Sequence, residues 1–286
     1  MYINPNWRVL TVGDGDLSFS LALSQQQLCR ELVASIYDNP DQLIEKYGED
    51  QHLSALHKQN VSVLTAFDVT NEACWHRLDN TKFDLVIFQF PLLPGFTSKQ
   101  AYQSQCNKLD VNTLNRRLLR TFLINAERFA LDRHGAQLCY ITSKDVKPYN
   151  EWDIERSIAQ KTAMKYVGLM AFDASQFIGY QVRNVDRNKY VKDTSGKTYV
   201  WTRESNQQLE PSLQLTITSS QKRELMVDEH NSDSCIICNA GPFQSAKDKQ
   251  AHLNTNKHSR LQRFDQLWRM ELACSDLDGS EEGEGC

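Results

Sequence analysis

Short apolar runs alternate with stretches of helical periodicity along most of this chain. The apolar runs have the length of β-strands and occupy residues 9–12, 33–37, 61–67, 83–90 and 137–142, with later candidates at 169–172 and 198–202. Between them we expect helices. Apolar residues recur at helical spacing in segments 18–32 and 111–131, segment 41–58 is a polar stretch of helical character, and shorter helices are expected at 72–78 and 152–166. This alternation predicts an α/β fold, a mostly parallel sheet with helices on both faces.

The run 83–90 is apolar on both faces, which is typical of a central parallel strand. The apolar stretch that begins there, 83–96, is the longest in the chain, but Pro91 and Pro94 interrupt it. It is far shorter than a membrane-spanning helix requires, so we expect no membrane partner.

The length and the changes in composition suggest a larger domain and a small module. The chain has 286 residues, enough for one α/β domain of ordinary size and something small. We expect the large domain at 1–205, a polar linker or extra strand at 206–233, a small module at 234–270 and an acidic, disordered tail at 271–286. The formal net charge of −4 does not indicate a nucleic-acid partner, so the question depends on the charge of local segments.

A glycine turn follows the first strand and carries the most informative pattern of the sequence. The strand leads into Gly13-Asp14-Gly15-Asp16-Leu17-Ser18, a helix follows, and the second strand ends at Asp38. Glycines let a backbone approach a ligand closely, and a helix N-terminus offers free N–H groups and positive potential. A carboxylate at the end of the second strand can accept hydrogen bonds from ribose hydroxyls. The pattern predicts a site for a nucleoside-containing cofactor.

The composition of the turn favours S-adenosylmethionine (SAM) over a dinucleotide. The dinucleotide fingerprint has a third glycine where this chain has Ser18, and Asp14 and Asp16 would repel a diphosphate. A sulfonium cofactor that ends in an amino acid meets no such repulsion. The alternative is a structural glycine turn in another α/β protein.

Two further strand ends are candidates for the same site, because ligands of open parallel sheets lie across the carboxyl ends of the strands. Asp68 could bind an adenine amino group, with Phe67 or Val69 covering the ring, although Asp68 also reads as a helix N-cap. After the fourth strand, Gln89-Phe90-Pro91 combines a planar amide for a base edge, an aromatic ring for stacking and a stiffening proline. A buried strand end before a Pro-rich turn is the alternative for that element.

An ordered series of motifs resembles the ribosomal RNA uridine-N3 methyltransferase family first recognised in fungal large-subunit RNA. The series spans roughly residues 8–185 and comprises Leu10-Thr11-Val12-Gly13-Asp14-Gly15-Asp16-Leu17-Ser18-Phe19-Ser20-Leu21, Ala34-Ser35-Ile36-Tyr37-Asp38 with Lys46-Tyr47, Phe83-Asp84-Leu85-Val86-Ile87-Phe88-Gln89-Phe90-Pro91, Leu114-Asn115-Arg116-Arg117-Leu118-Leu119, Ile141-Thr142-Ser143-Lys144 with Pro148-Tyr149-Trp152, and Gly179-Tyr180. The resemblance implies a Rossmann-like class I SAM-dependent methyltransferase fold and an RNA base as substrate.

The chain departs from the family's pattern in two places. The family reads Asn-Phe-Pro-His where this chain has Gln89-Phe90-Pro91-Leu92, and Tyr-Pro-Gly-Tyr-x-His-Arg where it has Phe177-Ile178-Gly179-Tyr180-Gln181-Val182-Arg183. Both changes lie where a target base would be handled. They motivate the alternative of a non-catalytic RNA-binding protein that keeps the methyltransferase fold.

Methylation of uridine N3 would require a base that is single-stranded or flipped and a site that stabilises its anion. Lys144 could stabilise that anion electrostatically, and Asn115 could orient Gln89 or the base. A solvated lysine beyond the fifth strand and an ordinary helix start are the corresponding alternatives. No residue stands out in the sequence as a general base.

The C-terminal module carries a metal-ligand pattern. Cys235 and Cys238 are followed by His252 and His258, and two thiolates with two imidazoles close a tetrahedral shell around structural zinc. Phe243 and Leu253 would form its small core. The other six cysteines are scattered, so we expect no disulfide framework and a reducing, cytoplasmic location. Cysteines and histidines that occur there by chance are the alternative.

The module's histidine spacing and its Gln250-Ala251-His252-Leu253 run resemble the fingers of U1- and matrin-type RNA-associated proteins. Six basic residues around it outnumber two acids and suit phosphates: Lys247, Lys249, Lys257, Arg260, Arg263 and Arg269 against Asp248 and Asp265. A solubilising face or a protein-binding finger would look similar.

Together these patterns predict a SAM-dependent RNA base methyltransferase, with uridine N3 of ribosomal RNA as the expected target and the finger aiding RNA binding. In a eukaryote the nucleolus would be the expected location. Methylation of a protein or small molecule remains a third possibility, which the basic finger disfavours.

Overall fold

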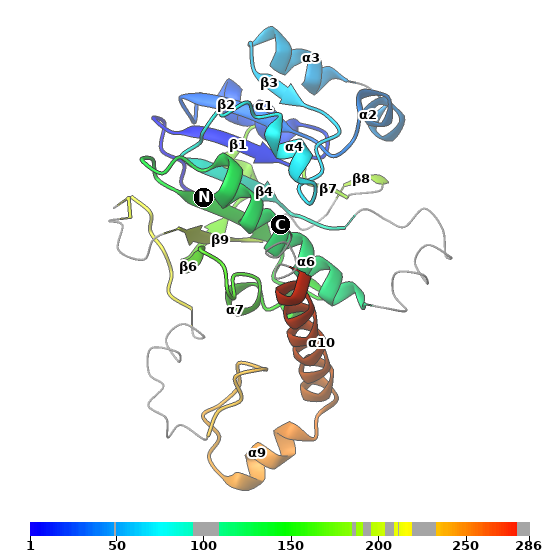
Figure 1. Cartoon of the computed structure of the whole chain (residues 1–286), viewed down its shortest axis with the longest axis vertical. Helices are drawn as coiled ribbons and strands as arrows, with labels where there is room; N and C mark the ends of the chain where they lie inside the picture. The colour runs from blue at the N-terminus through cyan, green and yellow to red at the C-terminus, as the bar shows by residue number, and fades with distance from the viewer. Residues whose placement is uncertain are drawn as a thin grey trace, which may run out of the picture.

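The computed structural model describes residues 1–48, 50–93, 109–184, 187–190, 196–203, 209–210, 212–218 and 233–278. A mixed sheet of seven strands forms its centre, in the order β3-β2-β1-β4-β5-β9-β6 (Figure 1). Its strands are β1 (Arg8–Val12), β2 (Glu31–Ser35), β3 (Ser62–Leu64), β4 (Leu85–Gln89), β5 (Leu138–Ser143), β6 (Lys165–Phe172) and β9 (Gly196–Thr202). Strands β1 to β5 pair in parallel, and β9 runs antiparallel to both β5 and β6. A separate pair joins β7 (Arg183–Asn184) and β8 (Arg187–Tyr190).

Helices connect the parallel strands, as crossover connections require. They are α1 (Ser18–Gln25), α2 (Pro40–Tyr47), α3 (Gln51–Lys58), α4 (Glu72–His76), α6 (Val111–Asn125) with a π-helical end η1 (Ala126–Ala130), and α7 (Ile154–Ser157). Short 3₁₀ turns are η2 (Tyr149–Glu151) and η3 (Ala174–Gln176), and the C-terminal helices are α9 (Ala246–Leu253) and α10 (Asn256–Asp278). In the part of the chain that the structure describes, no helix combines the length and the apolar character that crossing a bilayer demands.

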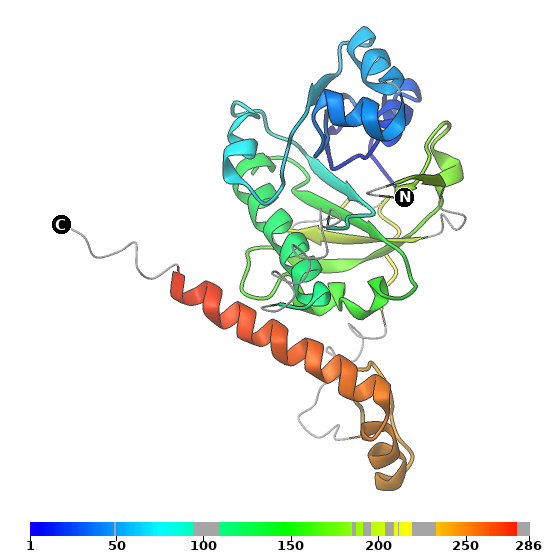
Figure 2. The ribbon, with the colours of Figure 1, turned by 90° about the vertical axis from the view of Figure 1, so that its right-hand side faces the viewer.

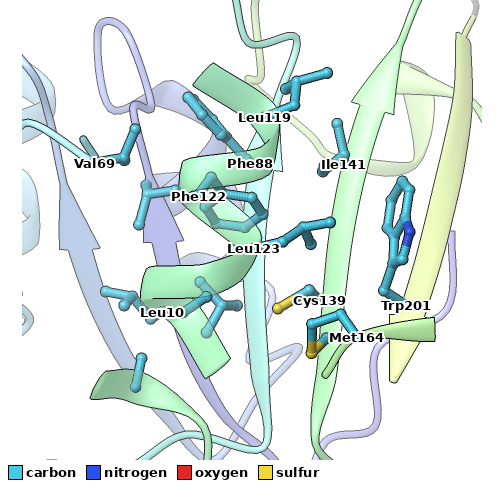
Figure 3. Packing of buried hydrophobic residues seen from close by; sticks show 14 of the residues in the cluster. Leu10, Val69, Phe88, Leu119, Phe122, Leu123, Cys139, Ile141, Met164 and Trp201 are labelled. Carbon is cyan, nitrogen blue, oxygen red and sulfur yellow. The ribbon is translucent and has the colours of Figure 1, made fainter. Parts of the chain in front are cut away.

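Two apolar layers cover the two faces of the sheet. On one face Phe122 and Leu123 of α6 pack over Leu10, Phe88 and their neighbours (Figure 3). On the other face, side chains of α1 pack with Leu85, Ile87 and Tyr140. Residues of β4 therefore alternate between the layers, and the predicted α/β sheet with helices on both faces is confirmed.

The interpretation of segment 152–166 as one helix is wrong. Only α7 is α-helical there, and Lys161 has a positive φ of 55°, which ends helical geometry. The strand expected at 169–172 begins instead at Lys165, because β6 pairs with β9 along its whole length. Among the described residues, the extra strand considered within 206–233 is reduced to an isolated bridge between Leu169 and Thr216.

Other predicted boundaries shift by a few residues. The first helix ends at Gln25 rather than at residue 32, β2 begins at Glu31, and segment 41–58 forms two helices that meet around Gly48. Gly48 has a φ of 81° and terminates α2. The linker expected at 206–233 lies mostly outside the described residues.

Helix α10 passes beneath the sheet domain and continues beyond residue 270, where we had placed the start of a disordered tail (Figure 2). Trp268 and Leu272 explain the continuation, because these two side chains are 1% and 5% exposed. The Trp268 Nε1 donates a hydrogen bond to the carbonyl oxygen of Ser157 at 3.1 Å. The last helix is therefore packed on the larger domain.

Candidate functional site

The carboxyl ends of β1, β2, β4 and β5 converge on one edge of the sheet. Val12 is paired with Phe88, and Gln89 with Thr142, so the turns after these strands are neighbours. Strand order reverses between β1 and β4, which is the topological switch point where open α/β sheets bind ligands. The predicted cofactor turn and the predicted base-handling element therefore lie on the same edge.

The glycine turn after β1 has the backbone conformation that glycine favours. Gly13 has a φ of 62° and Gly15 a φ of 39°. A Cβ atom on Gly13 would lie 2.6 Å from Cε2 of Phe88, so the turn also needs glycine for its packing on β4. The turn places the start of α1 beside the strand ends.

Asp14 is directed into the protein and caps the start of α1. Its Oδ2 accepts hydrogen bonds from the backbone N–H of Ser20 at 2.6 Å and from the Ser20 hydroxyl. Burial raises the pKa of the Asp14 carboxyl to about 7, against the opposing effect of the Ser20 hydrogen bonds. These contacts give Asp14 a structural role, and its predicted contact with a cofactor stays a prediction.

Asp16 forms an ion pair that spans most of the domain sequence. The Arg183 Nε lies 2.6 Å from Asp16 Oδ2, and the Arg183 guanidinium lies over the Tyr47 ring at 5.8 Å. The backbone oxygen of Asp16 lies 2.7 Å from Nδ1 of His52. The ion pair connects segment 177–183 to the glycine turn. The Ser18 Oγ also accepts a hydrogen bond from the Gln181 backbone N–H at 3.2 Å.

Asp38 lies just beyond β2 and is 6% exposed. The Lys46 ammonium donates to its Oδ1 at 2.7 Å from α2. Asn39 begins that helix with a capping box, since its side chain accepts from the Gln42 backbone N–H and the Gln42 side chain accepts in return. The local sequence therefore orients Lys46 back toward the strand end and holds the carboxylate in place.

Phe67 and Val69 do not suit the role of covering an adenine ring. They are 1% and 5% exposed, and the Phe67 ring packs edge to face on Trp75 at 5.2 Å. The protein itself thus fills the space around both side chains. Asp68 is half-buried and accepts from the Thr70 backbone N–H at 2.8 Å, whereas the N-cap of α4 is Asn71. The N-cap alternative for Asp68 is therefore wrong.

Gln89 ends β4 with a buried amide. The residue is 7% exposed, and its Oε1 has no hydrogen-bond partner among the described residues. Such an acceptor costs free energy until a donor reaches it. Phe90 follows with a φ of 46° and packs its ring edge to face on Phe172 at 5.4 Å, and Pro91 is buried. The element is well packed, and it contains a buried acceptor that no described residue fills.

Asn115 on α6 holds the backbone that follows Pro91. Its Oδ1 accepts from the Leu93 backbone N–H at 3.3 Å, and its Nδ2 donates to the Val111 carbonyl at 2.8 Å. Asn115 thus positions the loop after β4 rather than Gln89 itself. Lys144 is half-buried and follows β5 directly, two residues after the partner of Gln89.

The C-terminal module gathers its four predicted metal ligands. One ligand atom from each of Cys235, Cys238, His252 and His258 lies within 4.8 Å of the others. The His258 Nδ1 is 3.5 Å from both sulfur atoms, a separation that two thiolates and an imidazole adopt around tetrahedral zinc. Phe243 packs on the His252 ring at 5.1 Å. The donor set and spacing fit a structural zinc ion.

Sequence reasoning gave no role to three residues of this edge: Lys46, His52 and Arg183. Lys46 and Arg183 both fall inside motifs of the resemblance. The available signal for such a residue was a positive charge that could pair with a carboxylate of a neighbouring motif. Arg183 was harder to assign because its partner Asp16 lies 167 positions away.

Two curated proteins of Arabidopsis thaliana are similar to the chain. Heavy metal-associated isoprenylated plant protein 41 is 28% identical over 191 residues, which is 65% of this chain and 34% of that protein. Uncharacterized protein At4g26485 is 24% identical over 175 residues, 60% of this chain and 79% of that protein. The chain thus spans about a third of the length of the first relative.

Two solved structures resemble almost the whole chain. One is a protein of the NADB-Rossmann superfamily from Streptococcus agalactiae, with 11% identity, a TM-score of 0.43 and coverage of 94% of this chain and 92% of that chain. The other is an uncharacterized protein from Listeria monocytogenes, with 12% identity, a TM-score of 0.40 and 95% of both chains covered.

A family match covers the candidate site. Residues 10–184 match the family described as rRNA (uridine-N3-)-methyltransferase BTM5-like. This span contains the glycine turn, Asp38, Gln89, Asn115, Lys144 and Arg183. The chain belongs to this BMT5-like family.

Proposed function

We propose that this protein transfers a methyl group from SAM to a base of ribosomal RNA, and that the acceptor atom is uridine N3. The observation that carries the proposal is the family match over residues 10–184, which includes each strand end of the candidate site. The buried, unfilled acceptor of Gln89 at the switch point supports a ligand with an N–H donor there.

The residues of the turn fit the cofactor. Gly13 and Gly15 leave the backbone open to a ligand, and Asp38 is available to the ribose hydroxyls while Lys46 keeps its carboxylate oriented. Bound SAM supplies an electrophilic methyl group on a sulfonium centre. Methyl transfer would break the sulfur–methyl bond, form the N3–methyl bond, leave S-adenosylhomocysteine and pass the N3 proton to solvent.

The base would be held by the chain's own groups at the ends of β4 and β5. Gln89 would bind its edge, and Lys144 would stabilise the negative charge that develops as N3 loses its proton. Asn115 would keep the loop after Pro91 in position, so that acceptor and methyl group stay aligned. The zinc-bound C-terminal module would bind RNA.

A second candidate function is RNA binding without catalysis. The residue after Pro91 is Leu92, where the resembled family has a histidine, and this departure favours the candidate. Methyl transfer to any RNA would exclude it.

The deciding experiment incubates the full chain with methyl-labelled SAM and total RNA and analyses the nucleosides by mass spectrometry. Labelled N3-methyluridine is expected. Another methylated nucleoside would contradict the assignment of N3, and absence of label despite SAM binding would favour the second candidate.

Asp38→Asn tests the cofactor site. We expect SAM binding to weaken by about 1–3 kcal/mol, because an amide is a poorer acceptor for two ribose hydroxyls than a carboxylate. Calorimetric titration with SAM measures this change. Glu45→Gln, at an exposed position of α2, is the matched control and should bind like the wild type. An unchanged dissociation constant in Asp38→Asn would refute the role.

A further inference from the structure

A large cleft separates the sheet domain from the C-terminal module. Its volume is about 1500 Å³, and residues of η2, α7, β6 and β9 line one wall while the Cys235–Cys238 loop, α9 and α10 line the other. Figures 1 and 2 show α9 and α10 below the sheet domain, on the side where α7 lies. Small-molecule sites enclose roughly 300–1000 Å³, so the cleft has room for a polymer segment.

Positive charge prevails in the cleft. Eight cationic side chains and five carboxylates line it. Ion pairs within the lining offset part of this charge: Asp145 pairs with Lys197 at 2.6 Å, and Glu151 pairs with Lys147 at 3.5 Å. Glu151 also pairs at 2.6 Å with Arg260, which is not among the lining residues, and the cations of the lining still exceed its carboxylates by three. Exposed Lys147 and Lys257 extend the positive charge over both walls. The cleft favours an anionic polymer.

Aromatic rings lie between these charges. Tyr149, Tyr166 and Tyr199 line the sheet-domain wall, and the rings of Tyr166 and Tyr199 lie 6.2 Å apart. Tyr149 is half-buried and rests edge to face on Trp152 at 5.0 Å. Aromatic faces together with cations are what single-stranded nucleic acids require for base stacking and backbone contact.

The two walls are held in a fixed relation. Arg156 of α7 donates to the carbonyl oxygen of Ile236, in the loop between the two cysteine ligands, at 2.6 Å. Arg260 of α10 reaches Glu151 of η2, and Trp268 hydrogen-bonds to Ser157. These contacts join the module to the domain, so the module is docked.

One end of the cleft reaches the candidate active site. Lys197 is paired with Ser143 at the carboxyl end of β5, and Asp145 is the residue after Lys144. A strand in the cleft would therefore run from the metal-ligand loop to the edge of the sheet where Gln89 ends β4.

We propose that this cleft is the path of a single-stranded RNA segment next to the target nucleotide, and that both walls contact it. The proposal rests on the proposed function, and it assigns to one composite surface the RNA binding that the module alone would otherwise supply. Lysines of both walls contact phosphates, and Tyr149 stacks on a base.

Fluorescence anisotropy with the full-length, zinc-loaded protein and a short fluorescein-labelled single-stranded RNA of mixed sequence tests the proposal. Lys147→Gln on the domain wall and Lys257→Gln on the module wall should each weaken binding about threefold to tenfold. Each should also reduce the salt dependence of log K by about 0.7, because one phosphate contact is lost. Lys58→Gln, exposed on α3 outside the cleft, is the matched control and should change neither.

Tyr149→Leu separates stacking from charge. We expect weaker RNA binding with an unchanged salt dependence, because this variant keeps every cation. Zinc content and circular dichroism of each variant verify that it is folded.

Three outcomes would overturn the cleft as an RNA path. Loss of affinity in Lys257→Gln alone would mean that the module binds RNA by itself. Unchanged affinity in both lysine variants would exclude the cleft. Competition by polyglutamate as effective as that by unlabelled RNA would point to an acidic protein partner.

Methyl transfer, measured on the same variants, separates this proposal from the proposed function. Methyl transfer with an unchanged KM for RNA in both lysine variants would refute the cleft as an RNA path and support the proposed activity. RNA binding that depends on the cleft lysines, without methyl transfer, would refute the proposed activity and support the cleft as an RNA path.

Discussion

At the scale of single residues, Asp14 has the clearest consequence for stability. Burial raises the pKa of its carboxyl to about 7 in the folded chain, above its usual value of 3.8. Between these two values the folded state binds a proton that the unfolded state has lost. The free energy of unfolding therefore decreases as pH rises through this window, by up to about 1.4 kcal/mol per pH unit.

Asp14→Asn should remove this pH dependence, because an amide does not ionise and can still accept from Ser20. Urea unfolding of variant and wild type at about pH 4.5 and about pH 7.5 measures it. We expect the variant's stability relative to the wild type to be higher at the higher pH. Asp41→Asn, an exposed control on α2, should follow the wild type at both values. A difference that does not vary with pH would disprove the effect of burial.

The sequence allowed the prediction of residues that follow a strand, such as Asp38 and Gln89, because a strand end fixes their place in a parallel sheet. It did not reveal what neutralises or orients them. Lys46 reaches Asp38 only because α2 turns back, and Arg183 meets Asp16 only in the folded chain. The sequence also did not reveal that Trp75 packs against Phe67, the contact that makes Phe67 unsuitable for covering an adenine ring.

At the scale of elements, strands with continuous apolar runs were predictable and the segment after β5 was not. Ile154 and Ile158 are buried at helical spacing, which suggests a helix from sequence alone. The chain instead leaves α7 early and enters β6, whose partner β9 begins more than thirty positions later along the chain. Strand pairing over such a distance leaves no signal in the local sequence. The order of the strands at the antiparallel end of the sheet was therefore not predictable.

Helix α10 offers a test of docking. Trp268→Ala should destabilise the protein by about 3–5 kcal/mol, since it empties a buried indole site. Trp268→Phe should cost less, because the ring remains and only the bond to Ser157 is lost. Met270→Ala, at a position 65% exposed on the same helix, is the control and should have little effect. Urea unfolding measures all three, and equal stability of Trp268→Ala and Met270→Ala would contradict docking.

At the scale of the whole molecule, the domain and the module have different sources of stability. The sheet domain is held by two apolar layers, whereas the described part of the module buries few side chains besides Cys235 and His258. With so small a core, we expect the module to fold only when zinc is bound at its four candidate ligands. Spacing alone indicated the ligands, but it gave no sign that Arg156 and Trp268 would join the module to α7.

Removal of the metal should therefore separate the two parts. We expect Cys235→Ser to lose bound zinc and the fold of the module, while the sheet domain keeps SAM binding, because its layers do not include the ligands. Zinc quantification, circular dichroism and SAM titration measure the three quantities, and Cys274→Ser, at an exposed cysteine, is the matched control. Stoichiometric zinc retained in Cys235→Ser would show that the ligand set is wrong. Loss of SAM binding together with zinc would instead mean that the module supports the domain's fold through the Arg156 contact.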